Sequence, residues 1–432
     1  MNYNEALDYL YAQHPAYERQ GNGAYKPGLD TARQLDQLFG EPQQLFKSIH
    51  IAGTNGKGSV AHIIAAALQR SGYKVGLFTS PHLVDFRERI RVNGRMIPRA
   101  RVALYVKEFK RMKFAGQPTF FELCSAMAFR YFADVHVDYA IIETGLGGRL
   151  DSTNIITPIL SIITNIALDH TQLLGDTLEQ IAAEKAGIIK PGVPVVVGEA
   201  RDEAVRNVLL KTALQQGSRI IFATDERPVL SYSSDLNQLA IATRDYGVLN
   251  CQLTGEYQVA NARTIIVAIR ALIAMGLNID SRAVKSAFAH VCTITGLQGR
   301  WQVVDTSPLT IGDSGHNPAA FEIDMKQLNA TPHNELHLVL GFMADKDIDT
   351  MLGFIPEHAH CYLTRCDSPR ALDTATLVDK ARAHGLDAIP CDNVVDAYAQ
   401  AKRNAGPRDI IFVGGSMYLL GEFLNYINAN HD

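Results

Sequence analysis

The stretch from Ile49 to Val60, IHIAGTNGKGSV, combines three closely spaced glycines with one lysine. It lies between a short apolar run typical of a strand and an apolar pattern typical of a helix. Glycines here let the backbone approach a polyphosphate, while the helix N-terminus and the lysine supply positive potential. The stretch therefore predicts a nucleotide-binding loop made of Gly53, Thr54, Asn55, Gly56, Lys57, Gly58 and Ser59.

Position 58, directly after the lysine, carries a glycine where the usual phosphate loop has a hydroxyl residue that holds Mg²⁺. Another oxygen must then serve the metal. In open α/β sheets, ligands gather beyond the carboxyl ends of the strands. Ser80, Glu143 and His170 each follow or end a predicted strand. Singly they fit a turn serine, a strand-capping glutamate and a buried structural histidine, but together at one edge they favour a metal site.

Apolar runs alternate with helical patterns through the first part of the chain, which predicts a parallel α/β arrangement. Strands are predicted at residues 46–51, 74–79, 138–143, 159–165 and 193–198, with helices at 60–70 and 118–133 among them. Residues 217–256 look β-rich and irregular, which predicts an accessory hairpin or strand cluster, followed by a helix at 257–275.

The segment CTITGLQGR, residues 292–300, breaks this pattern with two glycines. A fresh series of strands follows, predicted at residues 301–305, 309–313, 336–341, 361–364 and 409–413, again alternating with helices. We therefore expect a domain boundary near residue 297, which gives domains at 1–297 and 298–432.

Composition narrows the function classes. The 432 residues, 47% hydrophobic and 20% charged, are typical of a globular protein of two or three domains. A net charge of −4 provides no basic stripe for nucleic acid. The six cysteines form no CxxC pair, so we expect reduced, mostly buried thiols. The N-terminus predicts an amphipathic helix rather than a signal segment, and no apolar run is long enough to span a bilayer. We expect a cytoplasmic protein without a membrane partner.

Seven motifs occur in order between residues 49 and 317: GTNGKGS, TSPHL, ETGLGGRLDSTN, ALDH, EKAGIIKPG, GRWQ and DSGHNP. This series resembles that of the folylpolyglutamate synthases and dihydrofolate synthases of the Mur ligase superfamily. The resemblance implies an α/β protein with an N-terminal P-loop ATP-binding domain of the Mur ligase type and a smaller, Rossmann-like C-terminal domain. It also implies ATP and Mg²⁺ as cofactors, and ligation of L-glutamate to a folate or to dihydropteroate.

The resemblance extends to individual residues of the ATP site. It implies that Ser80, Glu143 and His170 hold Mg²⁺, and that a carbamylated Lys185 helps to place a second ion near His170. A single helix lysine is by default solvated, so this role for Lys185 comes from the resemblance alone. The expected catalytic group is Lys57, Glu143, His170, Lys185 and His316.

Further positions match the nucleotide and amine sites of the family. Asn261, Arg300 and Asp313 match residues that contact the base, the phosphates and the ribose, respectively. His316 matches a residue near the incoming amine, and Ser416, in FVGGSMYL, is a candidate partner for glutamate. The last two lie in the second domain, so we expect the active site in a cleft between the domains.

The pterin pocket is expected to be lined by residues 17–29, 120–122 and 149–151, with Phe121, Glu122, Arg149 and Asp151 as the expected contacts. Residues 15–31 form a longer and more polar loop than is typical of dihydropteroate users, whereas SPHLVDFRERI resembles the bifunctional members. The ATP-site motifs are shared by both activities and do not separate them. We expect activity on both acids.

Two alternatives stay open at the level of sequence. A cell-wall amino-acid ligase of the same superfamily would carry an additional N-terminal domain for a UDP-linked substrate, but the phosphate loop begins near residue 53. A nucleotide-dependent switch of the GTPase type would need a guanine-reading N/TKxD motif, which the sequence lacks. We expect a monomeric ligase whose partners are small molecules.

Overall fold

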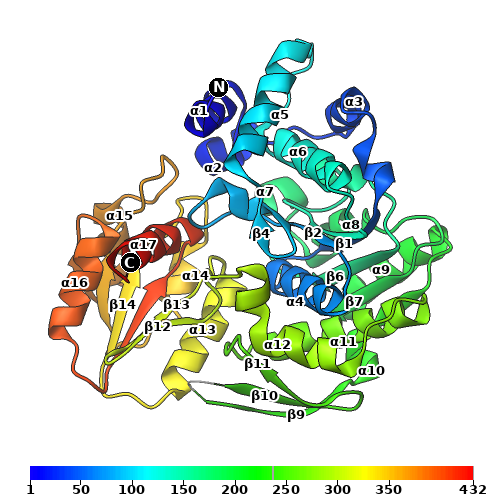
Figure 1. Ribbon diagram of the computed structural model, residues 1–432. Coiled ribbons are helices and arrows are strands. Elements are labelled where there is room, and N and C mark those ends of the chain that lie inside the picture. The colour runs from blue at the N-terminus through cyan, green and yellow to red at the C-terminus, as the bar shows by residue number, and fades with distance from the viewer. Residues whose placement is uncertain (236–237, 432) are drawn as a thin grey trace.

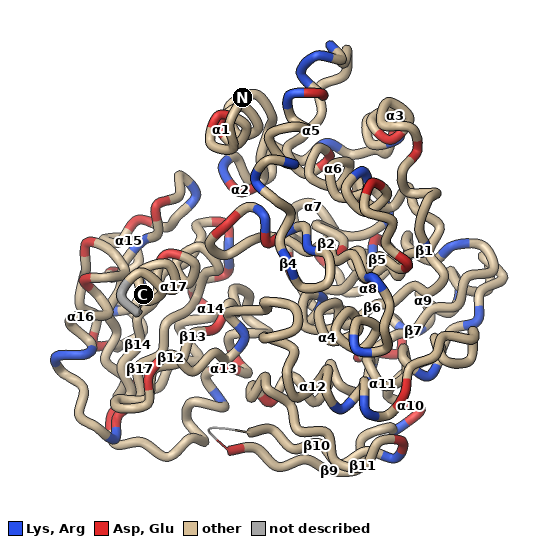
Figure 2. The backbone as a smooth tube through the Cα atoms, in the orientation of Figure 1, with Lys and Arg blue, Asp and Glu red and all other residues tan. Residues whose placement is uncertain are grey.

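The computed structural model describes residues 1–235 and 238–431. Two α/β units lie side by side, and a small separate sheet packs below the larger unit (Figure 1). Lys and Arg residues are interspersed with Asp and Glu over both units (Figure 2). In this view, neither unit carries charges of one sign alone.

The larger unit is built on a sheet with strand order β4-β3-β2-β5-β1-β6-β7-β8. Neighbours from β2 to β8 pair in parallel, and β3 and β4 add an antiparallel edge. The strands are β1 (Lys47–Ala52), β2 (Val75–Phe78), β3 (Ile90–Val92), β4 (Arg95–Met96), β5 (Tyr139–Glu143), β6 (Leu160–Asn165), β7 (Val195–Glu199) and β8 (Ile220–Phe222).

Helices cover both faces of this sheet, which explains why its strands are continuous apolar runs. Ile141 of β5 packs towards α4 (Lys57–Arg70), α11 (Gln258–Ala274) and α12 (Ser281–Thr295). Its neighbours Ala140 and Ile142 face the opposite core, with α1 (Tyr3–Gln13), α5 (Arg99–Met112) and α6 (Phe120–Asp134). Other helices of this unit are α2 (Tyr17–Gln20), α3 (Asp30–Leu38), α7 (Thr171–Leu174), α8 (Leu178–Ala186), α9 (Glu203–Gln215) and α10 (Ala223–Glu226), with 3₁₀ turns η1 (Gly21–Ala24), η2 (Pro42–Leu45), η3 (Phe86–Arg89) and η4 (Ser152–Ile155).

The accessory strand cluster predicted from sequence is an antiparallel sheet of β9 (Val229–Ser234), β10 (Leu239–Thr243) and β11 (Gly247–Cys251). Leu239, Ile241 and Leu249 from its inner face join the core beneath α11 and α12. The sheet therefore completes the larger unit rather than forming a separate body.

The smaller unit has a sheet with strand order β12-β13-β17-β14-β15-β16. Only the β12–β13 pair is antiparallel among its described strands. The strands are β12 (Gln302–Thr306), β13 (Leu309–Gly312), β14 (Leu336–Leu340), β15 (His360–Leu363), β16 (Asp387–Pro390) and β17 (Ile410–Gly414). The helices are α13 (Pro318–Ala330), α14 (Ile348–Leu352), α15 (Thr374–Ala383), α16 (Val394–Asn404) and α17 (Met417–His431).

Every strand predicted from the sequence is present, with ends displaced by two residues or fewer. The strands that the sequence did not predict are short or atypical: the β3–β4 hairpin carries arginines, β8 has three residues, and edge strand β16 ends in a proline. All six cysteines are free, as expected. In the described part of the chain, no helix combines the length and the apolar character needed to cross a bilayer.

Candidate active site

The glycine-rich loop joins β1 to α4 and wraps closely around its neighbours. Gly53 has φ 153° and Gly56 has φ 82°, a region that favours glycine. A β-carbon at position 53 would lie 1.8 Å from Oγ1 of Thr164, and one at position 56 would lie 2.2 Å from Oδ1 of Asn261. Lys57 folds back over the loop, where its Nζ donates hydrogen bonds to the carbonyls of Gly53 and Thr54, each 3.0 Å away.

Gly58, directly after the lysine, lies close to two charged side chains from other parts of the chain. A β-carbon there would lie 3.3 Å from Nη2 of Arg300 and 4.0 Å from Oε2 of Glu143. The missing side chain leaves room for a guanidinium and a carboxylate beside the start of α4. Arg300, on the smaller unit's side of the expected boundary, is also hydrogen-bonded to the Ser314 hydroxyl of the same unit.

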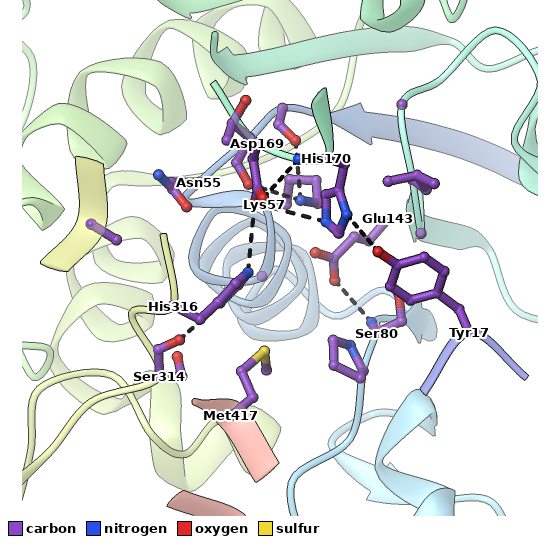
Figure 3. A pocket seen from close by; sticks show the side chains of 18 of the residues that line it. Tyr17, Asn55, Lys57, Ser80, Glu143, Asp169, His170, Ser314, His316 and Met417 are labelled. Atoms are coloured by element: carbon purple, nitrogen blue, oxygen red, sulfur yellow. Dashed lines mark hydrogen bonds and ion pairs between the residues drawn. The ribbon is translucent and has the colours of Figure 1, made fainter. Parts of the chain in front are cut away.

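Glu143 and His170 approach the loop from two strand ends. Glu143, at the end of β5, is buried, and this burial raises the pKa of its carboxyl. Its Oε2 accepts a hydrogen bond from the Ser80 N–H at 3.1 Å (Figure 3). Burial lowers the pKa of His170 to about 3, which keeps the imidazole neutral at pH 7 and able to act as a metal ligand. Its Nδ1 lies 2.9 Å from the Tyr17 hydroxyl.

The donor set has the chemistry of a partial magnesium shell. Within residues 1–235 and 238–431, no group of three or more His, Cys, Asp and Glu side chains could hold a metal by itself. Mg²⁺ usually keeps several waters and combines one or two carboxylates with phosphate oxygens. Ser80, Glu143 and His170, which line one cavity beside the phosphate loop, therefore fit an ion shared with a nucleotide.

Lys185 is buried in the structure, although a solvated helix lysine is the default expectation. Its side chain is 3% exposed, and its Nζ donates a hydrogen bond to the Gly53 carbonyl at 3.0 Å. Burial, together with the charge of Lys57, lowers the pKa of Lys185 to about 7. A substantial fraction of neutral amine is therefore present at neutral pH.

The smaller unit contributes buried polar groups that follow β13. The Asp313 carboxylate accepts hydrogen bonds from the Tyr257 hydroxyl at 2.7 Å and from the backbone N–H groups of Trp301 and Gly315 at 2.6 and 2.7 Å. The Nδ1 of His316 lies 3.0 Å from the Ser314 carbonyl, and burial lowers the pKa of His316 to about 4.

Asp169 connects the two units, and sequence reasoning assigned it no role. Its Oδ1 lies 2.5 Å from Nζ of Lys346, and its Oδ2 accepts a hydrogen bond from Nδ2 of Asn317 at 3.1 Å. Asn317 also donates to Oδ1 of Asn55 in the phosphate loop at 2.9 Å. Burial alone would raise the pKa of Asp169. The charge of Lys346 outweighs it, together with the charges that His170 and His316 carry at the acid pH where both are protonated, and the pKa of Asp169 is held below its ordinary value. Asp169 and Asn317 stand beside predicted residues in ALDH and DSGHNP, whereas no spacing signal marks Lys346.

One cavity of about 530 Å³ brings the two units together. It is lined by every predicted site residue except Arg149, including Lys57, Lys185, Asn261, Arg300, Asp313 and Ser416. Ser416 is fully buried at the start of α17. The cleft expected between the domains is therefore present.

Of the four residues predicted to contact the pterin end, three line the cavity and one does not. Phe121, Glu122 and Asp151 line the cavity. Glu122 also accepts hydrogen bonds from Thr119, and Asp151 accepts the N–H groups of Gly145 and Leu146, so both carboxylates help to shape the wall. Arg149 instead pairs with Glu184 at 2.7 Å, with a side chain 57% exposed. Its role at the substrate stays a prediction.

Family models match both units: the Mur ligase middle domain over residues 51–269, and the Mur ligase glutamate ligase domain over residues 299–417. The Bacillus subtilis dihydrofolate synthase/folylpolyglutamate synthase is 33% identical over 92% of this chain and 94% of its own length. The chain belongs to this Mur ligase family. Its fold is the α/β Mur ligase fold with middle and C-terminal domains, and the chain is an ATP-dependent ligase of the folylpolyglutamate synthase/dihydrofolate synthase type.

Solved structures of family members have the same fold over nearly the whole chain. The Escherichia coli enzyme in complex with DHPP and ADP is 30% identical, with a TM-score of 0.85 over 100% of this chain and 99% of that one. A bifunctional folylpolyglutamate synthase/dihydrofolate synthase with Mn, AMPPNP and L-glutamate bound is 28% identical, with a TM-score of 0.83 over 99% and 98% of the two chains. The chain spans about half the length (50%) of a Haloferax volcanii relative, a probable bifunctional folylpolyglutamate synthase/dihydropteroate synthase, to which it is 32% identical over 98% of this chain.

Proposed function

We propose that this chain uses ATP and Mg²⁺ to join L-glutamate to a reduced folate, and also to dihydropteroate, through an acyl phosphate. The observation that carries the proposal is the single cavity lined by the phosphate loop, the Glu143 and His170 side chains, and His316 and Ser416 of the smaller unit. Relatives solved with ADP, with DHPP, and with Mn, AMPPNP and L-glutamate support this combination of ligands.

Lys57 and the loop N–H groups neutralise the nucleotide's phosphates in this scheme. Asn261 contacts the base, Arg300 the phosphates and Asp313 the ribose. The lining position of all three and the three hydrogen bonds that orient Asp313 support these roles.

Ser80, Glu143 and His170 are the proposed Mg²⁺ ligands, and a carbamate on Lys185 contributes to a second ion. When bound, the metal supplies positive charge that stabilises phosphoryl transfer. The burial of Lys185 supports the carbamate, because CO₂ reacts with a neutral amine and the pKa of this amine is lowered to about 7.

The proposed reaction has two steps. A substrate carboxylate attacks the γ-phosphate, which gives an acyl phosphate and ADP, and the glutamate amine then displaces phosphate to form the amide. His316 lines the cavity and contacts the incoming amine, and burial keeps its imidazole neutral by lowering its pKa to about 4. Holding both reactants in one closed cleft provides effective molarities on the order of 10⁵ M.

The proposal also assigns residues to the pterin end and to glutamate, and sets the limits of the two domains. Phe121, Glu122, Arg149 and Asp151 serve the pterin end, and Ser416 serves glutamate. The ATP-binding domain is residues 1–297, and the smaller Rossmann-like domain is residues 298–432. We retain a cytoplasmic monomer as a prediction.

The test is a side-by-side assay of purified protein with ATP, Mg²⁺ and glutamate, in which dihydropteroate and a reduced folate are compared as acceptors. We expect glutamate-dependent ADP formation and an amide product with both. Activity on reduced folate alone would remove the dihydropteroate function. Activity on neither acid, with turnover on a UDP-linked peptide precursor, would favour the cell-wall ligase, and glutamate-independent hydrolysis would favour a switch.

A further inference from the structure

Arg370 belongs to the smaller unit, but its guanidinium contacts the N-terminal segment of the chain. Its Nη1 donates a hydrogen bond to the Tyr17 carbonyl at 3.1 Å, and its Cζ lies 4.6 Å from the centre of the Tyr17 ring. Its Nη2 pairs with Oδ1 of Asp345 at 2.6 Å. The side chain is 11% exposed. A planar guanidinium can stack and donate in two directions at once, which a lysine ammonium cannot do.

The N-terminal segment is shaped to receive this side chain. Gly21, at the end of α2, has φ 58°, and a β-carbon there would lie 3.1 Å from Nε of Arg370. The Gly21 N–H donates to the same Tyr17 carbonyl that Arg370 contacts. The turn from Tyr17 to Gly21 therefore closes directly against the guanidinium.

Tyr17, which Arg370 contacts, is itself in contact with His170. Its hydroxyl lies 2.9 Å from Nδ1 of His170, and the two rings meet edge to face, with centroids 5.5 Å apart (Figure 3). His170 has φ 50°, a left-handed conformation that is uncommon for a residue with a β-carbon. A backbone in this region persists where surrounding contacts hold it.

The segment that carries Arg370 also holds the residue before His170. The Arg370 carbonyl accepts a hydrogen bond from the Ala344 N–H at 2.9 Å, and Met343 and Ala371 form a β-bridge. Two residues beyond Ala344 is Lys346, which pairs with Asp169. One paired segment of the smaller unit thus contacts Asp169 directly and His170 through Tyr17.

From these contacts we propose that Arg370 is a positioning residue that holds the Tyr17 hydroxyl on His170, and so makes the orientation of His170 depend on contact between the two units. The inference rests on the proposed function for the use of His170 in the reaction. Arg370 acts through Tyr17 and not by binding a substrate carboxylate.

Kinetics of three variants separate these two roles. Tyr17→Phe keeps the ring and the carbonyl but removes the hydroxyl. Arg370→Ala removes the guanidinium that contacts the Tyr17 ring and carbonyl. Each should lower kcat on the order of 10-fold with KM for glutamate within about 2-fold, because geometry rather than binding is lost. The double variant should be no slower than Arg370→Ala alone, because both changes break one pathway.

Two further variants complete the kinetic test. Arg370→Lys should not restore kcat, and Arg365→Ala, an exposed arginine five residues away, should match the wild type. The proposal would be overturned if the fall in kcat of the double variant equalled the product of the falls in the two single variants. A raised KM for glutamate that Arg370→Lys corrects would also overturn it, because that pattern indicates a charge contact with substrate.

Amide hydrogen exchange of the full chain without metal or nucleotide tests, independently of turnover, whether Arg370 holds the turn from Tyr17 to Gly21. The N–H groups of Arg19, Gln20 and Gly21 bond to the carbonyls of Ala16 and Tyr17. Their exchange should accelerate on the order of 10-fold in Arg370→Ala, but not in Tyr17→Phe or Arg365→Ala. Unchanged exchange of these N–H groups in Arg370→Ala would overturn the proposal that Arg370 holds this turn. A wild type without glutamate-dependent turnover would instead overturn the proposed function and leave the exchange result standing.

Discussion

The backbone N–H of Ser80 donates a hydrogen bond to the side chain of Glu143, with 3.1 Å between N and Oε2. The two residues are 63 positions apart, but β2 and β5 pair in parallel, so the segments at their carboxyl ends meet. Two of the three proposed magnesium ligands are therefore brought together by the sheet itself.

Glu143→Ala and His170→Ala should each weaken magnesium-dependent ADP formation. Gly58 offers no hydroxyl as a substitute, and the Ser59 hydroxyl already accepts a hydrogen bond from Gln258 at 3.1 Å. A magnesium titration of ADP formation should show a requirement raised roughly 10-fold or more in both variants. Ser59→Ala is the matched control and should change it far less. A larger effect of Ser59→Ala would mean that the loop holds the metal in the ordinary way.

Lys57→Ala should remove ligase turnover and leave the fold intact. The side chain contacts carbonyls of its own loop and the cavity, so its loss removes phosphate neutralisation with little core packing. We expect a fall in kcat of roughly 10²-fold or more, with an unchanged circular dichroism spectrum and melting temperature. Substantial activity in the folded variant would contradict the assignment of the loop.

Lys185 should carry one CO₂ in the native protein. A lowered pKa leaves more neutral amine at a given pH, so a value of about 7 predicts more carbamate at pH 8 than at pH 6. Native mass spectrometry in bicarbonate buffer should show the added mass, and Lys185→Ala should be slow and partly restored by a small carboxylate. An unmodified Lys185 that points to solvent in an active, substrate-bound structure would refute this.

His50 should make stability depend on pH. It is fully buried beside the Thr153 hydroxyl, and burial, helped by the charge of Lys190, lowers its pKa to about 3. The unfolded chain, with an ordinary pKa near 6.5, binds the proton first, so this stability is complete above about pH 6.5 and is lost as pH falls towards 3.

Denaturant unfolding between pH 6.5 and 4.5 measures this loss. The free energy of unfolding should fall by up to roughly 1.4 kcal/mol per pH unit from this one group. His50→Gln, which can still bond to Thr153, should show a shallower slope. Identical slopes in the two proteins would mean that His50 is protonated in the folded state.

Sequence patterns determined the phosphate loop, the strand series and the accessory sheet, because each depends on the local spacing of apolar residues and glycines. They also predicted Ser80, Glu143 and His170 at one edge. Parallel strands bring their carboxyl ends to the same side of a sheet, so a position at a strand end is already a position in space. The later motifs added Asp313 and His316 through the resemblance, and Ser416 was a candidate from its place after the last predicted strand. The cavity includes all three.

Only the tertiary structure decided how the two units meet. The pairing of Lys346 with Asp169, the contact of Arg370 with Tyr17, the burial of Lys185 and the surface position of Arg149 join or separate residues that no local pattern connects. A charged side chain has the same helical or loop signature whether it faces solvent or a neighbouring unit. Its surroundings are set by the packing of distant segments, and that packing turned a glycine-rich loop and a few strand ends into one site.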